Sequence, residues 1–194
     1  MKKLPLTGIV LAGGQSRRFG QDKSLALIND KPLIEHVLTL LNSVCDEILI
    51  SVNDDKFRHL PFTSIADKES FGPLSGILAT LPAISHRAAL IIPTDTPHFN
   101  TGLIEYLYNN SVPDRISVAF NPDGQMEPLC AIYPKSLFPA IREIASNGER
   151  KLAVLIKKAG FKQVSITKDL PFYTENLFLN INRPEDLSSH ISKN

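Results

Sequence analysis

The chain has 194 residues, of which 43% are hydrophobic and 21% are charged, a balance typical of one globular domain spanning residues 1–194. The formal net charge of +1 gives no general basic excess for binding nucleic acid. No apolar run approaches the roughly 18 residues of a membrane span. Cys45 and Cys130 form no C-x-x-C pair, so neither a disulfide framework nor a zinc site is indicated, and we expect a soluble, cytoplasmic protein.

Strand and helix patterns alternate along the chain. A first strand runs from residue 9 into the glycines of LAGG, and further strands are predicted at 47–52, 62–66, 88–92, 116–120, 129–133, 162–166 and 177–181. Helices are predicted at 32–41, 74–81, 99–109, 135–146, 150–159 and 184–191. This alternation predicts a three-layer, Rossmann-like α/β fold whose mostly parallel sheet carries helices on both faces. Ligands of such sheets bind outside the carboxyl ends of the strands.

The stretch IVLAGGQSRRFGQDK, residues 9–23, contains the clearest candidate site. Its paired glycines let the backbone approach a ligand closely, and Arg17, Arg18 and Lys23 follow within ten residues. Backbone N–H groups followed by cations are the chemistry of a polyphosphate cradle. The spacing fits neither a Walker loop nor the G-x-G-x-x-G pattern. A glycine turn with solvated charges is the alternative.

Asp95 follows the most apolar predicted strand, in the sequence IIPTDTP. A carboxylate at this edge is well placed to hold a divalent metal, because Mg²⁺ favours one or two carboxylates plus phosphate oxygens. The alternative is an Asx turn or a helix N-cap. The nearby glycine loop and its cations favour the metal site.

Other polar residues follow strands. Ser51, Asn53 and Asp67 do so, and an Asn amide suits the edge of a nucleobase, with loop capping as the alternative. Glu127 precedes the strand predicted at 129–133 and is a second metal ligand, an acceptor contact or a solvated charge.

The end of the chain carries two further amides, Asn180 and Asn182. On a strand, positions two apart face the same side, so both amides could grip one heteroaromatic ring. Alternatively, Asn182 caps the helix that Pro184 and Glu185 would open.

The pattern LAGG-x-S-x-R-x-G-x-D-K resembles the signature loop of the nucleotidyltransferases that build activated sugars and cofactors. It is most similar to that of the molybdenum cofactor guanylyltransferases, although Phe19 stands where Met is usual. TDTP resembles their C-D-x-P segment, with Thr94 in place of Cys. FGPLSG, EPLC and NINRPEDL resemble their later segments, so the resemblance covers nearly the whole chain.

The resemblance implies a nucleotide-diphospho-sugar transferase type of fold and transfer of GMP from MgGTP to molybdopterin cofactor, with release of pyrophosphate. It implies catalytic roles for Arg17, Arg18, Lys23 and Asp95, with Mg²⁺ on Asp95. The implied nucleotide contacts are Leu11, Ala12, Gly13, Gly14, Lys23, Ser51, Asn53, Asp67, Gly72 and Asp95, and the implied acceptor contacts are Glu127, Asn180 and Asn182.

The expected partners are GTP, molybdopterin cofactor and molybdoenzyme maturation proteins. Three alternatives stay open. The first is a related enzyme that uses CTP with molybdopterin, or GTP with a small phospho-acid. The second is a non-catalytic GTP-binding module, and the third is a scaffold that presents molybdopterin.

Overall fold

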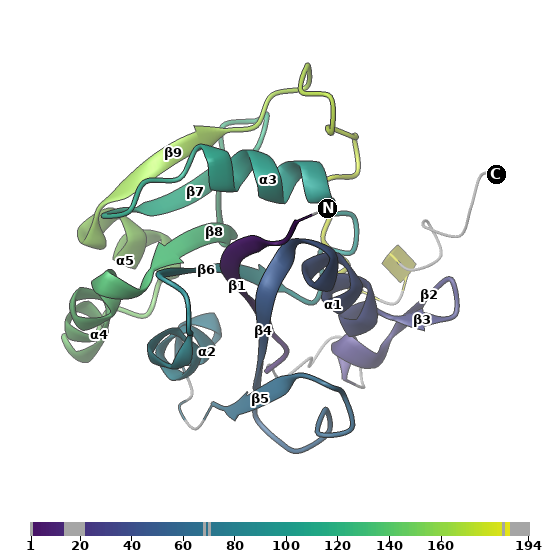
Figure 1. Ribbon diagram of the computed structural model, residues 1–194, viewed down its shortest axis with the longest axis horizontal. Helices are drawn as coiled ribbons and strands as arrows, with labels where there is room; N and C mark the ends of the chain where they lie inside the picture. Colours follow the sequence, from purple (N-terminus) through teal and green to yellow (C-terminus); the bar gives the residue numbers. More distant parts are fainter. Residues whose placement is uncertain (1, 14–21, 68, 70, 184, 187–194) are drawn as a thin grey trace.

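The computed structural model describes residues 2–13, 22–67, 69, 71–183 and 185–186 (Figure 1). Its centre is a seven-stranded sheet with the order β5-β4-β1-β6-β8-β7-β9. The strands are β1 (Leu4–Leu11), β4 (Cys45–Val52), β5 (Thr63–Ala66), β6 (Ala88–Pro93), β7 (Ile116–Phe120), β8 (Met126–Pro134) and β9 (Phe161–Ser165). Strand β8 is antiparallel to β6 and β7, and the other pairings within this sheet are parallel. The prediction of a mostly parallel sheet is confirmed.

Helices cover both faces of the sheet, which gives three layers (Figure 1). The helices are α1 (Leu33–Val44), α2 (Pro73–Thr80), α3 (Thr101–Asn109), α4 (Phe138–Ser146) and α5 (Leu152–Ala159). Helices α1 and α3 pack on one face, and α2, α4 and α5 pack on the other. Among the described residues, no helix combines the length and apolar character needed to cross a membrane.

The central strands read as continuous apolar runs because both of their faces are buried. In β1, Val10 packs into the core under α1 and α3, whereas Ile9 and Leu11 pack into the core under α2, α4 and α5. Side chains alternate between the faces of a strand, so each apolar run supplies both cores at once.

Most predicted elements form, with ends that differ by at most three residues, except that β1 begins at Leu4, five residues before the predicted start at residue 9. The helix predicted at 135–146 is a 3-10 turn, Lys135–Leu137, followed by α4. A two-residue hairpin was not predicted; it pairs β2 (Leu27–Ile28) with β3 (Lys31–Pro32) across Asn29 and Asp30, which both have positive φ. Of the helix predicted at 184–191, only Glu185 and Asp186 are described, and both are helical.

The strand predicted at 177–181 is wrong. The N–H groups of Leu177 and Leu179 donate to the carbonyls of Thr174 and Asn176, so the segment folds into consecutive turns. Its apolar residues Leu177 and Phe178 pack from these turns, because Leu177 is buried and the Phe178 ring lies edge-on to Phe99, with 5.8 Å between their centroids. Asn180 and Asn182 therefore do not project from a strand.

Strand β8 changes register opposite β7. Val118 pairs with Ala131, but the next residue of β7, Ala119, pairs with Glu127. An advance of one residue along β7 therefore corresponds to four residues along β8. Residues 128–130 lie between the two paired positions, outside the register with β7. The strand also begins before Glu127, whereas the sequence predicted its start at residue 129.

Candidate active site

The candidate site lies at the carboxyl ends of β1, β4 and β6, where a mostly parallel sheet is expected to bind its ligands. Gly13, Asn53 and Asp95 follow these three strands. The N–H of Ala12 donates to the carbonyl of Ser51 at 2.9 Å and so continues the sheet. This N–H is therefore already engaged. Gly14, Arg17 and Arg18, three of the predicted site residues, lie outside the described residues.

Gly13 and Asn53 are in close contact. A Cβ built on Gly13 would lie 2.4 Å from the Oδ1 atom of Asn53, which is closer than real Cβ contacts allow. Glycine is therefore required for the amide to reach the loop backbone. Ser51, the other candidate on this strand end, is only 1% exposed. Between these two predicted residues, Asn53 is the one whose side chain is exposed beside the loop.

Lys23 is held by a short capped turn. It begins the 3-10 helix Lys23–Leu25, and the Oδ1 atom of Asp22 accepts the N–H of Ser24 at 2.9 Å. Asp22 also forms an ion pair with Lys56, in the loop after β4. Burial raises the pKa of Asp22, but hydrogen bonds from Lys56 and Ser24 outweigh it and leave the pKa below its usual value.

The Asp22–Lys56 ion pair therefore ties the turn that carries Lys23 to the loop that carries Asn53. Sequence reasoning did not identify this pair. Asp22 stands two residues before Ser24, which is an N-cap signal, but nothing in the sequence pointed to Lys56.

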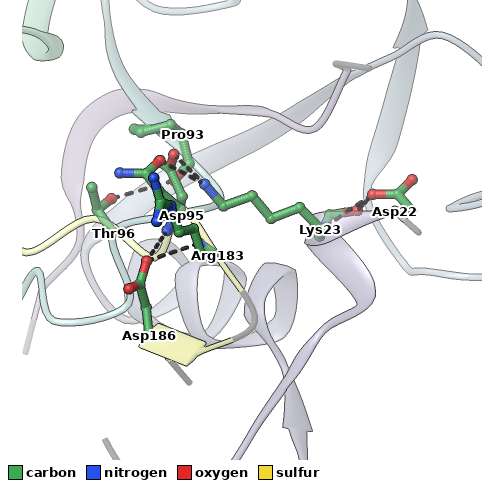
Figure 2. A network of polar contacts seen from close by, with 9 residues as sticks. Asp22, Lys23, Pro93, Asp95, Thr96, Arg183 and Asp186 are labelled. Carbon is green, nitrogen blue, oxygen red and sulfur yellow. Dashed lines mark hydrogen bonds and ion pairs between the residues drawn. The ribbon is translucent and has the colours of Figure 1, made fainter. Parts of the chain in front are cut away.

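The Lys23 ammonium contacts two residues that lie far apart in the sequence, Asp95 and Asn182. Its Nζ atom lies 2.8 Å from Oδ2 of Asp95 and 3.2 Å from Oδ1 of Asn182 (Figure 2). The side chains of Lys23 and Asp95 are 16% and 25% exposed, so water screens this ion pair only partly. The alternative interpretation of Asp95 as a helix N-cap is wrong, because Asn100 caps α3 by accepting the N–H of Leu103 at 3.0 Å.

The backbone of Asn182 is held by a side chain that follows it in the sequence. The carboxylate of Asp186 accepts the N–H groups of Asn182 and Arg183 at 2.7 and 2.8 Å (Figure 2). Asp186 thus reaches back to the start of its own turn, as in a capping box. The N–H of Ile181 donates to the carbonyl of Asp95 at 2.9 Å. These bonds fix the backbone on both sides of Asn182 and leave its amide directed at Lys23.

A cavity of about 290 Å³ brings together Asp95, Glu127, Asn180 and Asn182. The remaining lining residues are largely apolar: Pro73, Pro93, Thr96, Phe99, Pro128, Leu129, Cys130 and Leu152. The two amides therefore meet the same cavity although no strand carries them. Apolar walls with a few polar groups are typical of a site for a flat organic ligand.

Glu127 is not a solvated charge. It is partly buried, and its Oε1 atom accepts a hydrogen bond from Nδ2 of Asn121 at 2.9 Å. Burial raises the pKa of Glu127, and the bond from Asn121 offsets only part of that effect. Its carboxylate is thus partly desolvated at the wall of the cavity that Asp95 also lines.

Asp67 and Gly72 do not line this cavity, although Pro73, which follows Gly72, does. The N–H of Asp67 donates to the carbonyl of Val52 at 2.7 Å, and Gly72 precedes α2 with a φ of +61°, which favours glycine. Asp67 instead lines a larger cavity of about 730 Å³, together with Phe71 and Arg150. Burial, with a smaller contribution from Glu69, raises the pKa of Asp67.

The donor set suits a hard cation bound jointly with phosphate. Within the described part of the chain, no three His, Cys, Asp or Glu side chains gather as a metal cluster. Asp95 and Glu127 nevertheless line one cavity. Mg²⁺ commonly takes one or two carboxylates and completes its shell with phosphate oxygens and water, so these residues fit that ion.

Comparisons with known proteins indicate one family. The family described as MobA-like NTP transferase domain matches residues 8–164. The molybdenum cofactor guanylyltransferases of Aliivibrio salmonicida and Vibrio campbellii are 35% and 36% identical to the chain over 185 residues. These alignments cover 92% and 93% of the chain and 92% of each relative.

A solved structure is also similar. The molybdopterin-guanine dinucleotide biosynthesis protein A of Archaeoglobus fulgidus superposes with a TM-score of 0.81 at 25% identity. The superposition covers 95% of this chain and 96% of that one.

Proposed function

The chain belongs to the MobA-like NTP transferase domain family, and we propose that it is a molybdenum cofactor guanylyltransferase, which transfers GMP from GTP to molybdopterin cofactor. One observation carries this proposal. The Lys23 ammonium contacts Asp95 and Asn182 together, so the candidate nucleotide residues and the candidate acceptor residues meet at one point. An enzyme that joins two substrates requires such a meeting point.

The proposed reaction is an in-line displacement at phosphorus. A terminal phosphate oxygen of molybdopterin attacks the α-phosphorus of GTP, and the bond from that phosphorus to the bridging oxygen of the β-phosphate breaks. Pyrophosphate leaves with the bonding electrons. The attacking phosphate is already ionised, so no general base is required, and the protein acts by positioning the substrates and stabilising charge.

Lys23 is proposed to neutralise the triphosphate. Asp95 and the phosphates then compete for one ammonium group, and the capped turn held by Asp22 and Lys56 fixes where that ammonium can reach. We propose that Arg17 and Arg18 add positive charge to the same loop. Exposed Asn53, held against Gly13, is the better candidate than Ser51 for reading the base edge.

Asp95 would hold Mg²⁺, with Glu127 as the second candidate ligand in the same cavity. When bound, the ion would offset negative charge on the triphosphate. We further propose that the pterin of the acceptor enters the 290 Å³ cavity, with its polar edge toward Asn180 and Asn182 and its faces against Leu129 and Leu152.

The test is incubation of the protein with MgGTP and molybdopterin cofactor, followed by mass analysis of the product and a pyrophosphate assay. We expect the guanine dinucleotide cofactor and one pyrophosphate per product. A parallel arm replaces GTP with CTP, and preferential cytidylyl transfer would overturn the nucleotide assignment. GTP binding without pyrophosphate release would indicate a non-catalytic module. Molybdopterin binding that needs no GTP and gives no product would indicate a scaffold.

The product must pass to enzymes that use it, so molybdoenzyme maturation proteins remain predicted partners. Co-purification of the active protein with such proteins tests that prediction separately from the transfer reaction.

A further inference from the structure

The wall of the 290 Å³ cavity contains a local irregularity of the sheet. Because Val118 pairs with Ala131 and Ala119 pairs with Glu127, residues 128–130 form an excursion from β8. All three residues of this excursion line the cavity: Pro128, Leu129 and Cys130. The cavity therefore depends on three residues that the strand ladder does not fix.

A buried tyrosine contacts the excursion from inside the core. Tyr133 is 0% exposed, and its hydroxyl donates to the carbonyl of Pro128 at 2.9 Å. The Tyr133 backbone pairs with Ala89 of the central strand β6, so the ring starts from a well-anchored position. Burial raises the pKa of the phenol far above its usual value, so the hydroxyl stays a donor at every working pH.

We infer that Tyr133 is a positioning residue, which sets the location of the excursion and thereby the fit of the acceptor in its cavity. This inference rests on the proposed function, because it takes the cavity to be the acceptor site. Tyr133 does not line the cavity, so it acts through Pro128 and its neighbours. Gly13, Lys23 and Asn53 lie on other elements and should keep their geometry without this hydrogen bond.

The sharpest test is Tyr133→Phe, which removes one hydroxyl and keeps the ring in the core. Steady-state kinetics of the full-length protein would be measured with GTP and molybdopterin varied in turn. We expect the KM for molybdopterin to rise by about threefold to tenfold, as the loss of one buried hydrogen bond implies. The KM for GTP should stay within about twofold of the wild-type value.

Thr80→Val is the matched control. The buried Thr80 hydroxyl donates to the carbonyl of Gly76 at 2.6 Å, within α2. This variant also loses a buried hydroxyl-to-carbonyl bond, so urea unfolding should show a comparable loss of stability. Both of its KM values should stay unchanged, which separates positioning from general destabilisation.

Leu129→Ala changes the excursion on its cavity side. It removes part of the cavity wall and leaves the Tyr133 hydrogen bond intact. It should raise the same KM, and it serves as the second variant if Tyr133→Phe folds poorly. An unchanged molybdopterin KM in Tyr133→Phe, or equal changes in both KM values, overturns the inference while the proposed function stands. A wild-type protein that makes no dinucleotide overturns the proposed function and the inference together.

Discussion

The two halves of the candidate site are built in different ways. The half proposed to bind the nucleotide, with Gly13, Asn53 and Asp95, follows the ends of three parallel strands in the regular manner of an α/β sheet. The half proposed to bind the acceptor uses the excursion at residues 128–130 and the turns before Asn182. In the regular half, the strand ladders bring the ends of β1, β4 and β6 to one edge of the sheet. The irregular half needs individual hydrogen bonds to hold it.

The two halves also differ in chemistry. Ion pairs dominate the nucleotide half, where Lys23 meets Asp95 and Lys56 meets Asp22. The acceptor half presents amides between apolar walls. We therefore expect substitutions in the first half to act mainly through charge and on turnover. Those in the second half should act through fit and on acceptor affinity.

The largest expected effect is that of Asp95→Asn. The amide keeps the shape of the carboxylate but cannot hold Mg²⁺ well, so we expect turnover to fall by at least about 100-fold at physiological Mg²⁺. High Mg²⁺ or Mn²⁺ should restore part of the activity. Circular dichroism and thermal unfolding check that the fold survives. Normal activity per folded molecule would show that Asp95 only shapes its turn.

The second-largest expected effect is that of Lys23→Ala. Losing the ammonium leaves Asp95 and the triphosphate without a shared cation, so we expect turnover to fall by more than about tenfold with the fold intact. Lys31→Ala is the matched control, because Lys31 also uses its ammonium in a side-chain hydrogen bond, to Thr39 at 2.7 Å, but lies on the β3 hairpin and not at the contact with Asp95 and Asn182. Similar kinetics for both variants would contradict a phosphate-binding role for Lys23.

Substitutions of Asn180 and Asn182 test whether the two halves of the site bind different substrates. Asn180→Ala should weaken molybdopterin binding by about fivefold, the loss of one hydrogen bond, and leave GTP affinity unchanged. Asn182→Ala should also disturb GTP binding slightly, because Asn182 contacts Lys23 at 3.2 Å. Calorimetric titration of each variant with each ligand separates these effects. Equal weakening toward both ligands in Asn180→Ala would indicate a loosened domain instead.

The regular half of the site could be predicted from the sequence more completely than the irregular half. Gly72 was identified only through the resemblance of FGPLSG to a family segment, whereas the glycine loop and Asp95 were identified because each follows a strand whose apolar pattern is strong. Their mutual proximity follows from the rule that parallel strands share one carboxyl edge. The capped turn at Asp22 was recognisable in part, but its ion pair joins residues 34 positions apart without any motif.

The acceptor half was predicted less well for a physical reason. Residues 177–181 are mostly apolar, as in a short strand, yet Leu177 and Leu179 donate their N–H groups to local turns, Leu177 packs in the core and Phe178 packs against Phe99. Register shifts such as that of β8 depend on which partner strand lies opposite. Neighbouring sequence does not encode that choice. The amides still reached one cavity because the bonds of Ile181 and Asp186 orient the chain there.

The smallest expected effect concerns pH. Asp22 has a pKa below its usual value and Glu127 has one above it, so the two carboxylates act on stability with opposite signs. The charged form of Asp22 is favoured by folding; its contribution is present above about pH 4 and is lost as the pH falls through the folded pKa. Glu127 holds its proton more tightly when folded, so its contribution falls as the pH rises from about 4 through its folded pKa.

Urea unfolding of Asp22→Asn and Glu127→Gln between pH 3 and pH 7 should separate these signs. Asp22→Asn should lose stability relative to the wild type as the pH rises, because the ion pair with Lys56 no longer forms. Glu127→Gln should gain relative stability over the rise, since a neutral amide can still accept the bond from Asn121 without burying charge. Each change should stay within about 1 kcal/mol, because both groups are partly exposed. A shift of the same sign would mean that folding lowers the pKa of Glu127, and no shift would mean that its carboxylate is well solvated; either result would contradict its partial desolvation by burial.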